Sequence, residues 1–138
     1  MDAIEPILDF GLGLKFEALP TSVVDRVKLA VLDTLAATIA GARGQGVPEL
    51  TNLVTEWGGT PQATLLTSGA KVPIPLAVLV NGVAGRAWDL DDVHEQNTCH
   101  VNVNIVPAAL ALAEGRGPVD GRSFLTAIAV GSEFVCRL

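Results

Sequence analysis

The sequence predicts an all-α fold with at most one short extended segment. Apolar residues recur at three- and four-residue steps in several stretches, and prolines and glycines mark where these stretches begin and end. The composition agrees, since 49% of the 138 residues are hydrophobic and only 4% are aromatic. Such a chain, rich in Ala, Val and Leu, is typical of a helical core in which helices approach one another closely.

Two helices are expected in the first third of the chain. A weak one is expected at residues 4–14. In the second, Thr21 or Ser22 is expected to supply the N-terminal cap, and Gly41 ends the helix. Between cap and end, one face repeats apolar residues at helical spacing: Val24, Val27, Val31, Leu35 and Ile39.

The middle of the chain predicts two further helices and the one extended segment. Val47 and Pro48 begin a helix that Gly58 ends. Residues 61–68 are expected to be extended. Residues 73–90 are apolar nearly all round, which predicts a helix buried on every side.

Two helices are expected in the last third. Pro107 is expected near the start of the first, which continues through residues 108–114. Asp120 can cap the second, which runs from Arg122 to the end of the chain in full helical pattern. We therefore expect residues 1–138 to be part of an all-α domain that is truncated at its C-terminus.

Charge and composition exclude several classes of partner. The net charge is −6 and no basic run occurs, which excludes nucleic acid. No apolar run reaches the roughly 18 uncharged residues that a membrane span needs. The first residues carry acids where a secretory signal needs positive charge, and two cysteines are too few for a disulfide framework, so we expect a cytoplasmic protein.

The mean hydropathy of +0.44 is high for a soluble monomer. A surplus of apolar surface indicates burial against a partner subunit or against more of the same chain.

Titratable residues are concentrated in residues 88–107, WDLDDVHEQNTCHVNVNIVP. Apolar segments flank this stretch, and polar groups held between buried segments are costly to desolvate. It contains four carboxylates, both histidines and one of the two cysteines: Asp89, Asp91, Asp92, Glu95, His94, His100 and Cys99.

Metal and nucleophile sites fit this stretch poorly. A calcium loop beginning at Asp89 would need oxygen, glycine and glutamate where Val93, His94 and His100 stand. A transition-metal site from Asp89, Asp92, His94 and His100 is chemically possible but matches no standard zinc spacing. Cys99 is adjacent to His100, and adjacent side chains on a strand point apart.

Acid–base chemistry without a cofactor is the remaining option. Histidine moves protons near neutral pH, and a carboxylate close to other carboxylates gains proton affinity. The structural alternative is that Asp91, Asp92 and Glu95 only cap helix ends and face water.

The segment NGVAGRAWDLDDVHEQNTCHVNVNIVPAALALAEG resembles the MmgE/PrpD family, with its Asp-Asp pair, its histidine and the run PAALALAE. The resemblance extends to the run Val31-Leu32-Asp33-Thr34-Leu35 and to residues 121–138, so it covers nearly the whole chain. It implies an all-α main domain joined in full-length members to a smaller α/β lid, which is absent here. It also implies homodimers that need no metal or cofactor.

The family includes 2-methylcitrate dehydratase, cis-aconitate decarboxylase and iminodisuccinate epimerase. The resemblance places Asp89 and His100 on active-site positions as catalytic residues. Asp92 matches the second acid of the pair, and we take Asp92 and His94 as substrate-binding candidates. Val93 stands where the family has threonine, so a hydroxyl that would contact substrate is missing, and Val101 and Asn102 follow His100 where proline and a small residue are usual.

We therefore expect part of a 2-methylcitrate dehydratase-like lyase or isomerase that acts alpha to a carboxylate of a small di- or tricarboxylate. Further active-site lysine and histidine positions of the family lie beyond Leu138, so this chain alone is expected to be inactive. Asp91 and Glu95 are assigned to solvent or helix ends. The alternative is a non-catalytic helical oligomerisation module that keeps only the fold.

Overall fold

The computed structural model describes residues 4–96 and 98–137, and these form a layer of α-helices with one very small hairpin. The helices are α1 (Glu5–Gly13), α2 (Thr21–Ala40), α3 (Val47–Trp57), α4 (Ile74–Arg86), α5 (Asn102–Arg116) and α6 (Gly121–Arg137). Short 3-10 turns follow α1 (Phe16–Ala18) and α2 (Gly41–Arg43). The hairpin pairs β1 (Ala63–Thr64) with β2 (Lys71–Val72) antiparallel. The all-α prediction is confirmed.

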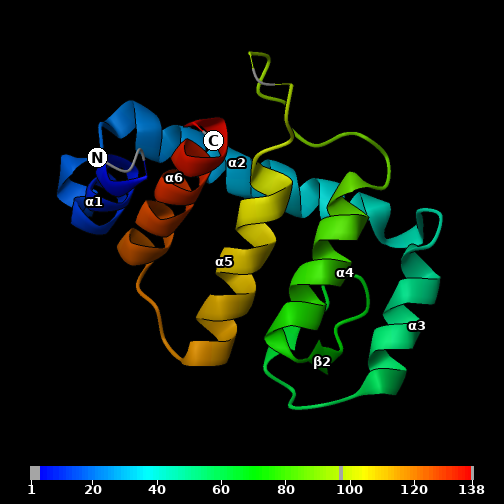
Figure 1. The fold of residues 1–138 in the computed structure, drawn as a ribbon. Coiled ribbons are helices and arrows are strands. Elements are labelled where there is room, and N and C mark those ends of the chain that lie inside the picture. The colour runs from blue at the N-terminus through cyan, green and yellow to red at the C-terminus, as the bar shows by residue number, and fades with distance from the viewer. Residues whose placement is uncertain (1–3, 97, 138) are drawn as a thin grey trace.

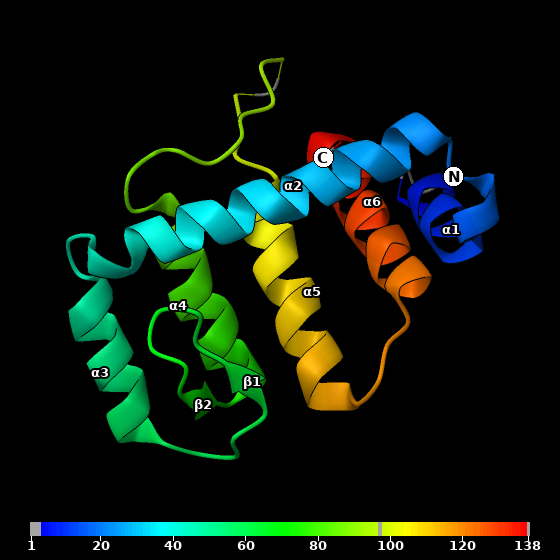
Figure 2. The same cartoon turned by 180° about the vertical axis from the view of Figure 1, so that it is seen from behind.

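The long helix α2 crosses one side of the molecule, and the later helices lie against it (Figure 1). From behind, α2 runs in front of α4, α5 and α6, and α3 flanks α4 at one end (Figure 2). The most extensive packing is between α4 and α5 and between α2 and α4. The central helices α4 and α5 are therefore covered by α2 on one side.

Most helix ends follow from local sequence, as predicted. Gly46 has a φ of 82° and precedes α3, and Gly58, with a φ of 65°, ends it. The Asp120 carboxylate accepts hydrogen bonds from the backbone N–H groups of Arg122 and Ser123, both at 3.0 Å. The expected cap of α2 is wrong. Pro20 occupies the cap position and makes no side-chain hydrogen bond there.

The fourth helix differs from its prediction in two ways. It ends at Arg86 instead of residue 90, and it is not buried on every side, because Leu79 is 44% exposed and Val83 is 38% exposed. The hairpin also contains a second two-residue strand, Lys71–Val72, that the sequence did not predict.

Pro107 lies inside α5 and does not begin it. A proline nitrogen carries no hydrogen, so the carbonyl of Val103, four residues earlier, loses its helical donor. Pro107, Val103 and Val106 are all buried. Tertiary packing of these residues therefore outweighs the cost of the lost hydrogen bond. The lost bond lies within the first two turns of α5.

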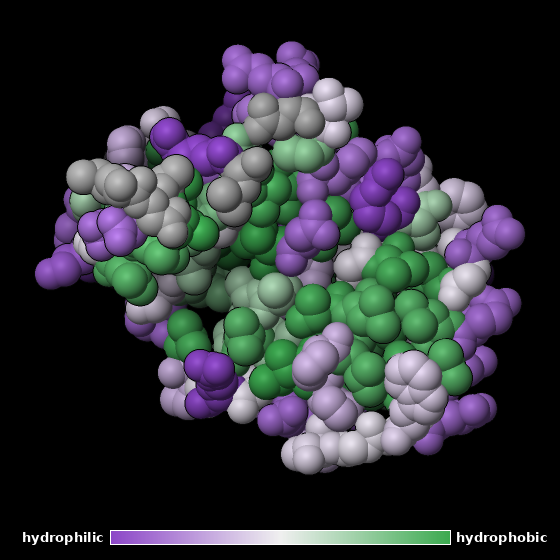
Figure 3. Space-filling view, in the orientation of Figure 1, coloured by the Kyte–Doolittle hydropathy of each residue, from purple (hydrophilic) through white to green (hydrophobic). Residues whose placement is uncertain are grey.

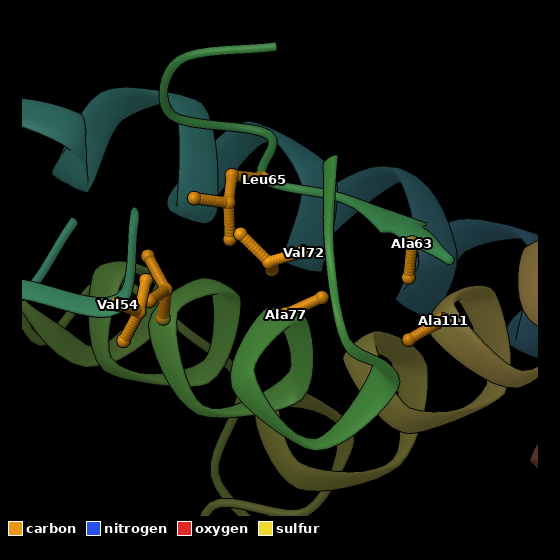
Figure 4. Close-up of a cluster of buried hydrophobic side chains, with 7 residues drawn as sticks. Val54, Ala63, Leu65, Val72, Ala77 and Ala111 are labelled. Atoms are coloured by element: carbon orange, nitrogen blue, oxygen red, sulfur yellow. The ribbon is translucent and has the colours of Figure 1, made fainter. Parts of the chain in front are cut away.

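The largest cluster of buried side chains lies under the hairpin, between α3, α4 and α5 (Figure 4). Its members are Val54, Ala63, Leu65, Val72, Ala77, Val80 and Ala111. Buried Asn81 on α4 ties the hairpin to this cluster. Its amide donates to the carbonyl of Thr64 at 3.0 Å, and its Oδ1 accepts from the backbone N–H of Leu66 at 2.9 Å.

The end of α2 approaches α4 so closely that only glycine fits. A Cβ on Gly41 would lie 1.8 Å from the carbonyl oxygen of Ala84. This contact fixes where α4 ends relative to α2, and the candidate active site begins at that end of α4.

The face opposite α2 carries hydrophobic side chains gathered over α4 (Figure 3). No helix in the described part of the chain has the length and hydrophobicity that a membrane span requires.

Candidate active site

The site forms where the chain leaves α4. The backbone N–H of Asp89 donates to the carbonyl of Arg86 at 3.1 Å, and Asp89 itself has a φ of 56°. This left-handed conformation is uncommon for residues other than glycine, although aspartate tolerates it better than most. The turn brings the Asp89 carboxylate back toward the last residue of the helix.

Arg86 binds two carboxylates through one nitrogen atom. Its Nη1 lies 2.5 Å from Oδ1 of Asp89 and 2.9 Å from Oδ1 of Asp91. The two aspartates differ in environment, since the Asp89 side chain is 73% exposed and the Asp91 side chain is 0% exposed. One guanidinium thus links a buried carboxylate to one at the surface.

His100 lies between the same two aspartates. Its Nδ1 is 3.0 Å from Oδ2 of Asp91, and its Nε2 is 3.6 Å from Oδ1 of Asp89. The 3.0 Å contact lacks the alignment of a hydrogen bond, so Nδ1 and Oδ2 are buried polar atoms without a hydrogen-bond partner among the described residues.

Arg86 also sets the electrostatics of the surface carboxylate. Its hydrogen bond and charge hold the pKa of Asp89 below its usual range. The same hydrogen bonds, first to Asp89 and then to Asp91, raise the pKa of the guanidinium. Asp89 therefore stays ionised at the surface.

The assignment of Asp91 to solvent or to a helix end is wrong. Its residue is 4% exposed, and its carboxylate contacts Arg86 and His100. A buried carboxylate against one nitrogen of an imidazole orients the ring and selects the tautomer that carries its proton on that side. Asp91 thus lies on the Nδ1 side of His100, and Nε2 lies on the side of Asp89.

Asp92 faces the other way and contacts α5. Its carboxylate accepts from the backbone N–H of Asn102 at 3.3 Å and from the Asn102 side-chain amide at 2.8 Å. The Asn102 side chain also accepts from the hydroxyl of Ser132 on α6 at 2.9 Å. A carboxylate at a helix N-terminus is favourable, so Asp92 has a structural role, and its contact with substrate stays a prediction.

His94 belongs to the segment between α4 and α5, which forms a loop that projects away from the helices (Figure 1). We call this segment the projecting loop. Its backbone N–H donates to the carbonyl of Cys99 at 2.8 Å and closes this loop as an isolated bridge. Val93 and Glu95 beside it are exposed. The structure therefore brings Asp89 and His100 together. Their catalytic roles and a substrate contact of His94 stay predictions.

Three ligand atoms of Asp89, Asp91 and His100 lie within 4.8 Å of one another, a group that could hold a divalent metal ion. This set differs from the one considered from the sequence, because Asp91 takes part and the expected ligands Asp92 and His94 do not. Arg86 already gives both carboxylates a positive partner. The arrangement suits proton transfer by an imidazole held between two acids.

Sequence reasoning missed Arg86 and Asp91. No local signal identified Asp91, because its burial arises only when separate elements of the chain meet. A signal for Arg86 was its place in the last turn of a helix, three residues before Asp89.

Known proteins match this chain along nearly all of its length. The family model described as the MmgE/PrpD N-terminal domain matches residues 5–138. Human cis-aconitate decarboxylase is 31% identical over 134 residues, which is 91% of this chain and 27% of that protein. Cis-aconitate decarboxylase of Aspergillus terreus is 25% identical over 131 residues, 92% of this chain and 27% of that protein. The chain thus spans about a quarter of the length of these relatives.

Proposed function

Because the chain belongs to the MmgE/PrpD family, we propose that it supplies part of the active site of a cofactor-independent lyase or isomerase. The substrate is a small di- or tricarboxylate, and the reaction takes place at a carbon alpha to a carboxylate. The observation that carries the proposal is the imidazole of His100 between buried Asp91 and exposed Asp89.

In this proposal Nε2 of His100 exchanges the proton. When a base removes the alpha proton, the electron pair forms a carbon–carbon double bond, and a beta hydroxyl leaves with a proton as water. In a decarboxylation, a carboxylate leaves as carbon dioxide and its bonding electron pair stays on the substrate. Nε2 of His100 then returns a proton to the carbanion. Asp91 holds the ring, and ionised Asp89 stabilises the imidazolium that forms.

Two reaction branches fit this site. The sequence predicts a 2-methylcitrate dehydratase-like elimination, and the similarity to cis-aconitate decarboxylases favours decarboxylation. Proton transfer at the alpha carbon is common to both. A homodimer and a cytoplasmic location remain part of the proposal.

The experiment uses a protein in which this chain continues to the length of its relatives. Asp89→Asn and His100→Gln should each lower turnover of a small polycarboxylate by at least about a hundredfold, the usual contribution of a positioned acid or base. Glu95→Gln is the matched control, because Glu95 is exposed in the projecting loop. Full activity of both variants would favour the alternative of a non-catalytic helical module.

A further inference from the structure

A row of side-chain hydrogen bonds links the turn after α4 to α6 through Asn102, the first residue of α5. The Asn102 amide donates from Nδ2 to Oδ2 of Asp92 at 2.8 Å, and its Oδ1 accepts from the hydroxyl of Ser132 at 2.9 Å. All three residues are half-buried. We call these three residues the amide bridge.

The donors and acceptors of the amide bridge fit together in one way. A carboxylate accepts hydrogen bonds and does not donate them, so the amide nitrogen of Asn102 has to face Asp92. The amide oxygen then faces Ser132, whose hydroxyl can donate. A flipped amide would bring its oxygen against the Asp92 carboxylate and lose that bond. The bridge therefore holds the Asn102 side chain in a single orientation.

The amide bridge lies beside the contact between His100 and Asp91. Asp92 directly follows Asp91 in the chain, and Asn102 comes two residues after the histidine. The bridge thus joins the same two segments that bring Nδ1 of His100 within 3.0 Å of Oδ2 of Asp91. Among the described residues that pair of atoms makes no hydrogen bond, so no bond of its own fixes the ring. The bonds of the amide bridge hold the two segments together at this point.

The backbone of His100 is also tied to α5. Nδ2 of Asn104 donates to the carbonyl of His100 at 2.7 Å, which joins the residue to the first turn of the helix. The helix α6 packs beside α5 (Figure 1). A Cβ on Gly131 would lie 2.8 Å from Cγ2 of Ile105, so the two helices are in close contact next to Ser132. The bridge therefore connects the surroundings of His100 to α6.

We propose that Asn102 is a positioning residue for His100, and that its bond from Ser132 makes the placement of the imidazole depend on α6. In this role Asn102 contacts neither the substrate nor the exchanged proton. It holds the segment that carries His100 against the segment that carries Asp91. The inference rests on the proposed function only in taking His100 as the residue that exchanges the proton.

Two alanine variants test the amide bridge on the chain itself. Asn102→Ala removes both of its bonds and Ser132→Ala removes one, and alanine suits either position because both lie in helices. Long-range 1H–15N NMR of the isotope-labelled chain measures the chemical shifts of the two ring nitrogens of His100. We expect these shifts to move toward those of the urea-unfolded chain in both variants, and further in Asn102→Ala.

Two serine variants separate positioning from a general loss of stability. Ser132→Thr keeps the hydroxyl and should keep the wild-type ring shifts of His100. Ser123→Ala is the matched control, because Ser123 lies at the opposite end of α6 and its hydroxyl donates to Oδ2 of Asp120 at 2.6 Å. It loses a bond of the same kind, so its melting temperature should fall as in Ser132→Ala while the His100 shifts stay unchanged.

Turnover gives a second measurement in the full-length protein. Asn102→Ala should lower kcat by about tenfold or more, because a small displacement of a reacting group is costly. KM should change little, because the amide bridge does not contact the substrate in this proposal.

Wild-type ring shifts of His100 in both alanine variants of the bridge would overturn the inference. An equal change in Ser123→Ala would overturn it too, as would shifts in Ser132→Thr that match those of Ser132→Ala. The proposed function is tested separately, by the turnover lost in His100→Gln, and these NMR results do not depend on it.

Discussion

Nδ1 of His100 lies 3.0 Å from Oδ2 of Asp91, a carboxylate with no exposed side-chain surface. The opposite nitrogen of the ring faces the exposed carboxylate of Asp89. The imidazole thus has a buried carboxylate at one nitrogen and an exposed carboxylate at the other.

Asp91→Asn should lower turnover in the full-length protein by about a hundredfold or more, even though Asn has nearly the same shape. The substitution removes the charge that balances Arg86 and stabilises a protonated His100. It should also lower the free energy of unfolding by about 1–3 kcal/mol, the cost of disturbing a buried hydrogen-bonded group. Steady-state kinetics and urea unfolding measure the two effects. Unchanged kinetics would leave Asp91 only a structural role.

The ion pair between Arg86 and Asp89 predicts a contribution to stability that is lost at acid pH. Since the pKa of Asp89 is lowered in the folded chain, its contribution to stability is complete above the ordinary aspartate pKa and is lost as pH falls through the lowered value. Arg86→Gln should raise the pKa of Asp89 toward its usual range, as read from carboxyl NMR titration. Lys28→Gln, which removes the separate Lys28–Asp25 pair, should leave the Asp89 titration unchanged.

Gly41→Ala should destabilise the chain by about 1–3 kcal/mol, the usual cost of overpacking. The new methyl would meet the carbonyl of Ala84 on α4, and backbone cannot rotate out of the way as a side chain can. Gly13→Ala is the control, because a methyl group on Gly13 would meet no packed neighbour within 4 Å. Thermal unfolding of the two variants should separate them, and equal melting temperatures would contradict the close contact of α2 with α4.

Chelating agents should change neither the melting temperature of the chain nor the turnover of the full-length protein. The positive charge of Arg86 already neutralises part of the charge on Asp89 and Asp91. Elemental analysis after dialysis is the direct measurement. Stoichiometric zinc or iron that is lost in His100→Ala would replace the acid–base interpretation with a metal site.

Val93→Thr tests the departure from the family at the residue after the aspartate pair. Val93 is 49% exposed, so stability should change by less than about 0.5 kcal/mol. If the missing hydroxyl limits elimination, the variant should form more conjugated alkene from a 2-methylcitrate-like substrate, seen as a rise in ultraviolet absorbance. Val119→Thr, at a position 47% exposed outside the loop, should not.

The sequence predicts helices well where the signal is local. Gly58 ends a helix and Asp120 begins one as expected, because a left-handed glycine or a capping carboxylate depends on adjacent residues only. Gly41 also ends its helix as expected. Pro107 shows the limit of such signals. Its place inside α5 depends on burial against other helices, which no local pattern contains.

The same limit applies to the candidate site, where burial between elements is not visible in the local sequence. Asp89 and His100 were identified through a resemblance in their motif, and the structure places them together. Asp91 was missed because charge and spacing do not reveal burial, which arises only when α4, the turn after it and the residue before α5 meet. Arg86 was missed because its partners follow it in a turn that requires the left-handed conformation of Asp89.

The projecting loop is anchored at both of its ends. Asp92 holds one side to Asn102, and the bridge from His94 to Cys99 closes its base. Insertions next to Glu95 should therefore lengthen the tip without moving His100 relative to Asp91. The length of this loop can then vary without a change in the 3.0 Å contact between Nδ1 of His100 and Oδ2 of Asp91.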